Sequence, residues 1–422
     1  MIRRNRRLRL MLSVLSTSLL LLLSACGGAS GTSSANSKPL TVGELFPMSG
    51  REPFVGQWFL HGAKAGIVDV NAHGGVMGHQ LKAALQDTGG DPVDAVPAWR
   101  KLDTQNPTFE VGPSSLEIQG VIKDYGPAHL VDFMEGGTSE LDHMQYPYVW
   151  RTTPSDTTLT AAMAYYAVQK HYMTASMLFE TTSDATAELD ATTRFYKAHG
   201  GTILDTEQLA LHQSSYRTEV EKAFAKNPQM IFIKTDPETA STLFSDIKEL
   251  GHMNVPFVSD DGGVTIDYAK AMGLDAASKY LTGVAGAPPA GGAWTTFLKD
   301  YQQAWGTSSP LQNSANTYDA VIIAALAMTD AKSTSGKDWV GKIKDVSNPP
   351  GQKCTNYASC VKLLQAGKKI NYEGATGPND FNQYHNVFGP WDIAQFDATG
   401  TSTNVLMPVP ASAIASYINQ SK

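Results

Sequence analysis

The sequence predicts an α/β protein made of two parallel β-sheets, each covered by helices on both faces. Short apolar runs alternate with longer amphipathic stretches along the chain, which is typical of parallel sheets connected by helices. About 385 residues follow Lys38, more than one core usually accommodates, so two domains are expected. Repeats of solenoid period and low-complexity runs are not seen in this part of the sequence.

The first strand is expected over Lys38–Phe46, where apolar and polar residues alternate before Pro47. A helix is expected over Gln57–Ala72, which has an apolar residue every three or four positions. The same order then repeats, with strands at Leu81–Leu85, Phe109–Gly112, Leu130–Met134, Ser176–Phe179, Met230–Ile233 and Pro256–Ser259, and helices at Pro92–Leu102, Thr157–Gln169, Glu219–Ala225 and Pro237–Leu250. Since parallel sheets bind ligands beyond the carboxyl ends of their strands, the loops after these strands are the place to look for a site.

The N-terminus carries a secretory signal followed by a cysteine. Five arginines precede the apolar run Met11–Leu23, which is too short to span a membrane as a helix. The sequence Leu23-Ser24-Ala25-Cys26 resembles the lipobox of bacterial lipoproteins, which implies removal of residues 1–25 and acylation of Cys26; an ordinary signal peptide is the alternative. Residues 26–37 then form a tether, because Gly27–Ser37 contains only Gly, Ala, Ser, Thr and Asn.

Charge and cysteine content indicate which partners and which kinds of site are expected. The net charge is −7, and without the five leader arginines the mature chain carries −12, so nucleic acid is not an expected partner. Cys354 and Cys360 are six residues apart in a chain predicted to be exported, which favours a disulfide over two free thiols. A metal site at this pair is not expected, since no histidine flanks it at ligand spacing.

Several motifs together resemble the leucine/isoleucine/valine-binding protein family of type I periplasmic binding proteins, which serve importers of the ATP-binding-cassette (ABC) class. The resemblance extends over about Pro39–Gly400. The motifs are Phe46-Pro47-Met48-Ser49-Gly50, Gly62 and Gly66, Asp69 to Gly78, Asp87, Gly112-Pro113-Ser114-Ser115, Arg151 to Asp156, Tyr318-Asp319-Ala320 and Ile370 to Pro378.

The resemblance implies two lobes that close on a ligand around three crossings. Lobe one would comprise residues 38–152 and 285–389, and lobe two residues 153–284 and 390–422. The expected function is that of an extracytoplasmic lipoprotein, held at the membrane by its lipid alone, which binds a small amino-acid-like or amide solute without a cofactor and delivers it to an ABC permease.

The resemblance also implies which residues bind the ligand. Ser114 or Ser115 after the third strand, with Ser115 favoured, and Gly137-Thr138 after the fourth would receive a carboxylate, although both segments could instead cap helices. Asp261 would receive an ammonium group, unless Asp260 to Gly263 is only an exposed turn. Phe54, in the loop after the first strand, would supply an aromatic wall.

Two departures from the family suggest an acidic pocket. Relatives carry aromatic residues where this chain has Thr182-Ser183-Asp184-Ala185 and Lys234-Thr235-Asp236-Pro237. If Asp184 and Asp236 face the ligand, a cationic or multiply hydrogen-bonding solute is expected, because buried carboxylates need partners. The alternative is that both aspartates cap the helices that follow them.

Two other classes of function were considered. Nucleophile-elbow, zinc-protease, phosphate-loop and Cys-x-x-Cys motifs do not occur in the sequence, so an enzyme such as a hydrolase is not expected and no catalytic residue is assigned. A ligand-sensing receptor of the same fold stays open as the alternative, because sensing and transport both require only closure on a ligand.

Overall fold

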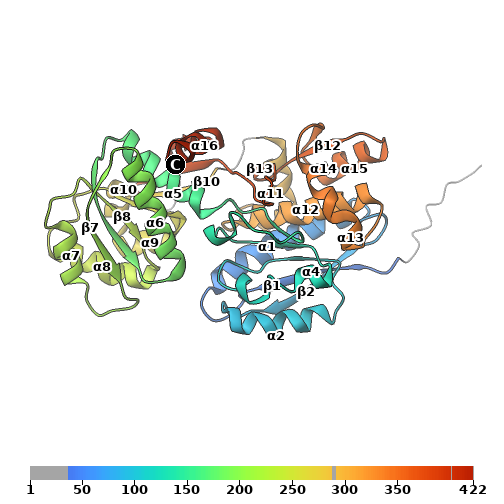
Figure 1. Cartoon of the computed structure of the whole chain (residues 1–422), viewed down its shortest axis with the longest axis horizontal. Coiled ribbons are helices and arrows are strands. Elements are labelled where there is room, and N and C mark those ends of the chain that lie inside the picture. Colours follow the sequence, from blue (N-terminus) through green and yellow to red (C-terminus); the bar gives the residue numbers. More distant parts are fainter. Residues whose placement is uncertain (1–36, 288–290, 401, 422) are drawn as a thin grey trace, which may run out of the picture. The chain divides into compact units, whose positions relative to one another are not determined.

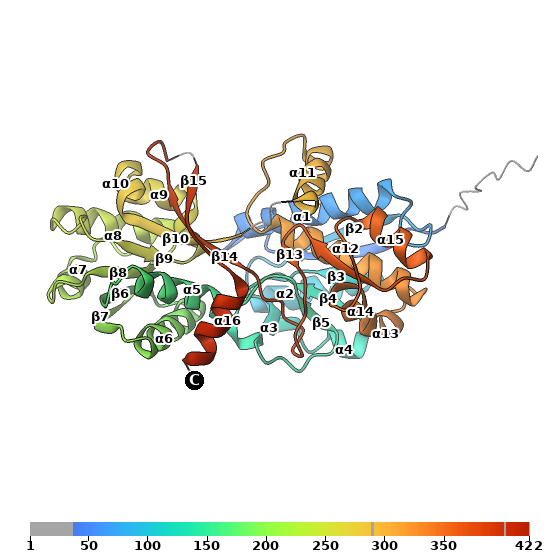
Figure 2. The ribbon, with the colours of Figure 1, turned by 90° about the horizontal axis from the view of Figure 1, so that it is seen from above.

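The computed structural model describes residues 37–287, 291–400 and 402–421. The predicted signal peptide and Cys26 lie outside the described residues. Within them, the strands form a five-stranded sheet, a seven-stranded sheet and a small three-stranded sheet. Figure 1 shows the elements along the chain, and Figure 2 shows the same ribbon from above.

The five-stranded sheet has the order β2-β1-β3-β4-β5, and all its pairs are parallel. Its strands are β1 (Leu40–Phe46), β2 (Leu81–Asp87), β3 (Phe109–Val111), β4 (Asp132–Met134) and β5 (Val149–Arg151). The connecting elements are α1 (Pro53–Ala72), α2 (Pro92–Asp103), α3 (Ile118–Val121), α4 (Tyr125–Ala128) and the 3-10 helix η1 (Ser139–Leu141). The carboxyl ends of β3 and β4 therefore open at the same edge of this sheet.

The seven-stranded sheet has the order β15-β14-β10-β9-β8-β6-β7. Strands β7, β6, β8, β9 and β10 pair in parallel, while β14 and β15 add as antiparallel strands at one edge. The strands are β6 (Thr174–Glu180), β7 (Thr202–Leu209), β8 (Met230–Lys234), β9 (Phe257–Ser259), β10 (Leu281–Gly286), β14 (Trp391–Phe396) and β15 (Thr403–Val409). The helical elements are α5 (Asp156–Gln169), α6 (Ser183–Ala198), α7 (Arg217–Phe224), α8 (Pro237–Glu249), η2 (Asp261–Val264), α9 (Ile266–Met272), α10 (Leu274–Tyr280) and α16 (Ala411–Gln420).

The remaining elements pack beside the first sheet. A three-stranded sheet contains β11 (Gln352–Cys354), β12 (Ile370–Gly374) and β13 (Gly377–Pro378). The helices here are α11 (Gly292–Trp305), α12 (Ser314–Ala331), α13 (Gly336–Trp339), η3 (Val340–Lys342), α14 (Ile343–Ser347) and α15 (Tyr357–Gln365). The predicted disulfide between Cys354 and Cys360 is present and joins β11 to α15.

The α/β class and the strands predicted from the sequence are confirmed, with small shifts at their ends. Helix α1 begins at Pro53, four residues before the predicted start at Gln57. Proline suits the first helical turn, since its missing N–H would have no partner there. Phe54 consequently lies in the first turn of α1 rather than in the loop before it. The predicted lobe boundaries stay a prediction.

Helices α1 and α12 pack closely because two glycines lie between them. A side chain at Gly62 would overlap the backbone of Ser314, and one at Gly66 would overlap Val321. This explains why the motif after the first strand contains glycines in an otherwise regular helix. The core formed here buries most of α12, whose residues Val321 to Met328 have no exposed surface.

Asp319 connects two motifs that are far apart in the sequence. Its carboxylate accepts hydrogen bonds from the hydroxyl of Tyr372 (2.7 Å), the backbone N–H groups of Ala375 and Thr376 (2.9 Å each) and the hydroxyl of Thr376 (2.6 Å). Since Asp319 is fully buried, these donors replace the water that its charge would otherwise need. The Tyr-Asp-Ala motif of α12 therefore fixes the turn after β12.

Several buried glutamates, Glu44, Glu110 and Glu135 among them, have no basic group within 4 Å in the described part of the chain. Burial raises the pKa of Glu44, Glu110 and Glu135 to about 8 each. Glu110 accepts a hydrogen bond from the hydroxyl of Tyr125 at 2.5 Å, and Glu135 accepts from the hydroxyls of Thr152 and Thr153 at 2.9 and 2.7 Å. These carboxyl groups are therefore largely protonated in the folded state at neutral pH.

We expect the folded chain to lose stability as the pH rises from 5 to 8. Carboxyl groups whose folded pKa lies above the unfolded value favour folding at low pH, and that contribution disappears as the pH rises to the folded pKa. Glu110→Gln keeps the shape and the tyrosine contact, so it should reduce the fall in melting temperature between these pH values by about 2 °C or more. Calorimetry checks this, with the exposed Glu221→Gln as control; equal pH dependence in both variants would contradict it.

Candidate functional site

Two loops at the carboxyl ends of β3 and β4 meet through Ser115 and Thr138. The backbone N–H of Thr138 donates to the Ser115 hydroxyl oxygen at 3.1 Å, which leaves the hydroxyl proton of Ser115 free to donate to another acceptor. Neither side chain caps the helix that follows. Gly136 and Gly137 lie between them, where an added side chain would overlap Ser115 and Asp156 respectively.

Ser114 is bound to other protein groups. It is buried, and its hydroxyl contacts the carboxylates of Glu117 and Glu52. Because its proton has a carboxylate partner inside the protein, Ser115 is the better placed of the two serines to bind a ligand.

Arg151 holds the Thr138 loop in place. The guanidinium is fully buried and donates to the carbonyl of Thr138 (2.7 Å), the carboxylate of Asp142 (2.8 Å) and the amide oxygen of Asn386 (3.0 Å). Asp142 also accepts from the hydroxyl of Ser155 at 2.5 Å, and that hydroxyl caps α5. The Arg151 to Asp156 motif therefore positions both the Thr138 loop and the start of α5.

A buried lysine lies at the carboxyl end of β8. The ammonium group of Lys234 contacts the carboxylates of Glu188, Asp260 (3.0 Å) and Asp184 (3.4 Å). The lysine side chain is only 12% exposed, and Glu188 and Asp260 are buried still more. Acidic residues from α6 and from the loop after β9 are thus brought together around one positive charge.

The pKa shifts follow from this arrangement. Burial alone would lower the pKa of Lys234, but the carboxylates around it, Glu188 and Asp260 above all, raise it well above its usual value. Burial raises the pKa of Asp184, yet the attraction of Lys234 and local hydrogen bonds lower it overall. Lys234 is therefore charged, and Asp184 is its ionised partner.

Further carboxyl groups near this cluster have raised pKa values. Burial raises the pKa of Asp156 to about 7, with Lys234 opposing and Asp261 adding to the shift. Burial also raises the pKa of Glu52 and Glu180 to about 7 each, with Asp184 contributing to both. This region has more carboxyl groups than its single lysine can neutralise.

Asp261 lies in the same region. Burial and the neighbouring Asp260 raise the pKa of its carboxyl group to about 6. The carboxylate accepts a hydrogen bond from the side-chain amide of Gln312 at 3.1 Å. Gln312 precedes α12, so this bond links the loop after β9 to a segment packed beside the five-stranded sheet. The backbone at Asp261 begins the short helix η2 rather than an isolated turn.

Asp236 and Phe54 are directed elsewhere. Asp236 caps α8, since its carboxylate accepts from the backbone N–H groups of Glu238 (2.8 Å) and Thr239 (3.1 Å), and His212 lies 3.3 Å from it. This is the capping alternative that the sequence left open. The Phe54 side chain is 53% exposed and packs edge-on against Trp58. Contact of either residue with a ligand stays a prediction.

A small hollow adjoins these groups. It is lined by residues of η1 and its preceding loop, α5 and α6, namely Thr138, Ser139, Asp156, Thr157, Asp184, Ala187, Glu188 and Ala191. Its volume of about 10 Å³ holds about one water molecule, so a ligand of amino-acid size would require it to widen. A larger hollow of the described chain lies away from these residues, beside α12, α14 and α15.

Ser115 and Thr138 lie after the neighbouring strands β3 and β4, and Asp184 lies after β6 of the other sheet, where it lines the same hollow as Thr138. Lys234 was not among the residues predicted from the sequence to bind a ligand, and the predicted ligand contacts stay predictions. The two segments that replace the family's aromatic residues, Thr182–Ala185 and Lys234–Pro237, were interpreted as a source of carboxylates. The second segment also contains Lys234, whose ammonium group lies 3.4 Å from the carboxylate of Asp184. The place of Lys234 in the sequence is the signal that could have identified it, because it directly follows the apolar residues Met230 to Ile233 of a buried strand.

A two-sheet α/β fold with polar groups gathered at the carboxyl ends of its strands defines a solute-binding protein of the type I periplasmic binding class. A family model described as periplasmic binding protein matches residues 39–401. The chain therefore belongs to the periplasmic binding protein family, and more closely it resembles the leucine/isoleucine/valine-binding type.

Individual relatives agree with this assignment. The substrate-binding protein BasB of a chemotactic signal transduction system in Halobacterium salinarum is 22% identical over 395 residues, covering 88% of this chain and 90% of that protein. A Leu/Ile/Val-binding protein of Citrobacter freundii is 30% identical over 151 residues, 35% of this chain and 41% of the relative. The branched-chain amino acid transporter substrate binding protein LivJ of Streptococcus pneumoniae, solved with isoleucine, has a TM-score of 0.72 and 18% identity, covering 87% of this chain and 99% of LivJ.

Lys234→Met should reduce the free energy of unfolding at pH 7.5 by about 3–5 kcal/mol, because it leaves Glu188 and Asp260 buried without their counter-ion. The loss should shrink at pH 5, because burial already raises the pKa of Glu188 well above its usual value and this carboxyl group takes up a proton more readily there. Denaturant unfolding at both pH values measures this. Lys248→Met, at an exposed position of α8, is the control, and equal stability of the two variants at pH 7.5 would contradict the role of Lys234.

Proposed function

We propose that this protein captures a small, cationic, amino-acid-like solute outside the cytoplasm and delivers it to an ABC importer. The observation that carries the proposal is the excess of carboxyl groups around Lys234. A cationic group on the ligand would supply the charge that this region lacks. An aliphatic side chain would offer no partner to the same carboxyl groups.

The polar head of the ligand would be bound from two sides. The Ser115 hydroxyl and the Thr138 loop would donate to a carboxylate or amide oxygen. Asp261 would accept from an ammonium or amide group, and Asp184 would interact with the more distant cationic part. Asp236, which caps α8, is left out of this set. In this arrangement closure of the lobes brings donors and acceptors together around the ligand.

A second candidate function is ligand sensing. It is favoured by one observation, the match to BasB over almost the full length of both chains, because BasB is described as part of a chemotactic system. A receptor role would use the same site. Purification of the protein from membranes together with either a permease or a signalling receptor would separate the two roles.

Binding of a cationic solute should strengthen as the pH rises from 5 to 7.5 and then level off. The carboxyl groups of Asp261 and Asp156, with pKa values of about 6 and 7, must lose their protons to pair with a cation, so binding releases protons. Calorimetry with L-arginine as probe, in buffers of different ionisation enthalpy, measures both quantities, and L-leucine serves as the aliphatic comparison.

In the same assay Asp261→Asn should weaken binding by roughly 10- to 150-fold, the loss of one hydrogen bond to a charged group. Asp267→Asn, on the exposed start of α9, is its matched control. Tighter binding of L-leucine than of L-arginine would contradict the cationic ligand, and unchanged affinity in Asp261→Asn would remove Asp261 from the site.

The proposed lipid anchor is tested at Cys26. With the native cysteine, the mature chain should begin at residue 26 and partition into detergent, since the resemblance to a lipobox implies acylation there. Cys26→Ser should block both processing and partitioning. Mass spectrometry of the N-terminal peptide and detergent phase separation measure these outcomes. Unchanged processing in the variant would instead indicate an ordinary signal peptide.

A further inference from the structure

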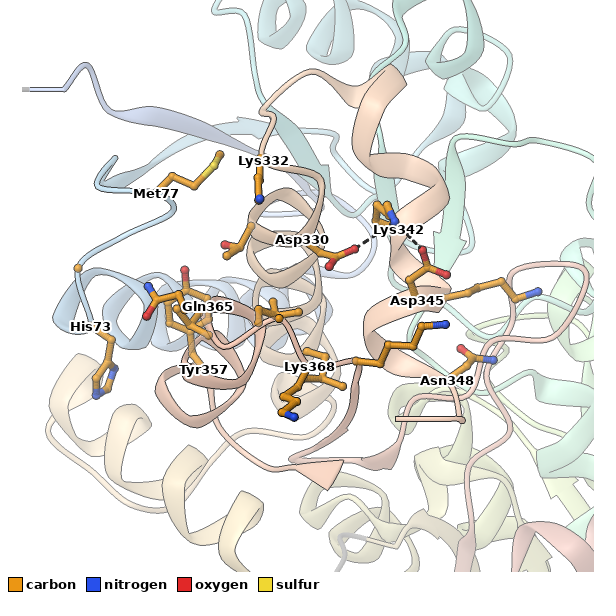
Figure 3. Close-up of a pocket in the computed structure, with 18 of the residues that line it drawn as sticks. His73, Met77, Asp330, Lys332, Lys342, Asp345, Asn348, Tyr357, Gln365 and Lys368 are labelled. Atoms are coloured by element: carbon orange, nitrogen blue, oxygen red, sulfur yellow. Dashed lines mark hydrogen bonds and ion pairs between the residues drawn. The ribbon is translucent and has the colours of Figure 1, made fainter. Parts of the chain in front are cut away.

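The larger hollow is a basic groove beside the five-stranded sheet. Its volume is about 890 Å³. It is lined by the loop after α1, the end of α12, α14, α15 and the segment leading into β12 (Figure 3). The basic groove is defined here by five lysines and one histidine, together with two aspartates: Lys332, Lys342, Lys344, Lys368, Lys369, His73, Asp330 and Asp345.

Most of the positive charge in the basic groove is not neutralised by the protein. Lys342 pairs with Asp330 (3.3 Å) and Asp345 (2.9 Å), as Figure 3 shows. Across the part of the chain that the structure describes, no carboxylate lies within 4 Å of the other four lysine ammonium groups. Lys368 and Lys369 are exposed. Five lysines against two aspartates thus give a positive surface on a mature chain whose net charge is −12.

The described chain begins at the edge of this groove. The hydroxyl of Ser37 donates to the carbonyl of Gly78 at 2.6 Å, and the carbonyl of Lys38 lies 2.9 Å from Nδ1 of His79. Gly78 lines the basic groove, and so does its neighbour Met77, whose side chain is 42% exposed. Ser37, the first described residue and the one that follows the segment from Cys26 in the sequence, therefore lies beside the groove.

The distance from Cys26 to this point is limited by the chain itself. Eleven residues, 27–37, connect them, and even fully extended they span at most about 40 Å. A lipid on Cys26 would keep the edge of the groove within that distance of the membrane surface. Exposed lysines with an apolar neighbour are suited to such a surface, because phosphate head groups carry negative charge.

We propose that the basic groove docks on the anionic lipid phosphates of the membrane to which the protein is anchored. The proposal rests on the lipid anchor suggested above. The acidic remainder of the chain is repelled by the same surface, so the groove would be the face turned toward it. Docking would then set the orientation in which the body meets a membrane partner.

The test uses the lipidated full-length mature protein in nanodiscs, either with 30% phosphatidylglycerol or with phosphatidylcholine alone. Hydrogen exchange of the amides in residues 340–350 and 365–370 should slow at least twofold in the anionic discs. The difference should vanish at 1 M NaCl, where the Debye length is about 3 Å, and it should not be reproduced by inorganic phosphate added to zwitterionic discs.

The groove variant K344E/K368E/K369E should lose the difference between the two kinds of disc. The control K197E/K226E/K248E changes three exposed lysines on helices and loops of the seven-stranded sheet by the same charge and should retain it. Circular dichroism and calorimetry with the solute confirm that each variant is folded. The salt effect on the native protein tests the proposal even if the groove variant does not fold.

Each other outcome contradicts the proposal in a recognisable way. Equal exchange in both kinds of disc, for a protein that co-elutes with them and binds its solute, overturns docking and leaves the proposed function intact. Protection by inorganic phosphate alone identifies a free-anion site instead, and protection that appears only when a permease is added identifies an acidic protein partner. Elution apart from both kinds of disc refutes the anchor, and docking with it.

Discussion

The Arg151 guanidinium is the contact on which the arrangement of the site depends. It is buried at the end of β5 and binds a carbonyl and a carboxylate at the two ends of η1, together with an amide of the distant segment at Asn386. A buried guanidinium must have its donors satisfied, so these partners are held at fixed positions. Thr138, the cap of α5 and the returning segment at Asn386 are thereby aligned before any ligand is present.

Lys234 is the second group on which the site depends, because it sets the ionisation of the carboxyl groups around it. One lysine stabilises Asp184 as an anion, while burial raises the pKa of Asp156 and Glu52 by more than the nearby cations lower it. In the proposed function, a cationic ligand would bind by displacing protons from these carboxyl groups.

The fold could be predicted from the sequence because its signals are local. Alternating residues and helical periodicity identify strands and helices without knowledge of distant partners. Ser115, Thr138 and Asp184 were named through the family resemblance, and their contact with a ligand stays a prediction. Helix α1 starts earlier than the apolar periodicity predicts, because Pro53 occupies the first helical turn, a position that proline favours as well as loops.

The rest of the site could not be predicted, because it depends on distances between segments. The sequence around Asp236 fits either a pocket residue or a helix cap. The structure favours the cap, because the carboxylate accepts hydrogen bonds from two backbone N–H groups of α8. The contacts of Lys234 join α6, β8 and the loop after β9, which no single stretch of sequence reveals. The basic groove is likewise formed by lysines from separate segments that are unremarkable one by one.

The two glycines between Ser115 and Thr138 restrict how this binding site can change its selectivity. Any side chain at Gly136 or Gly137 would overlap Ser115 or Asp156, the first residue of α5, so substitution there would disrupt the contact between the two loops instead of adjusting it. In the proposed site, variation in ligand preference, whether by natural divergence or by protein engineering, is left to positions whose side chains can be exchanged together with their partners, such as Asp184 with Lys234. In that proposed site, new solutes would therefore be acquired mainly through the loops of the seven-stranded sheet, while the loops of the five-stranded sheet would keep their contact with the polar head group.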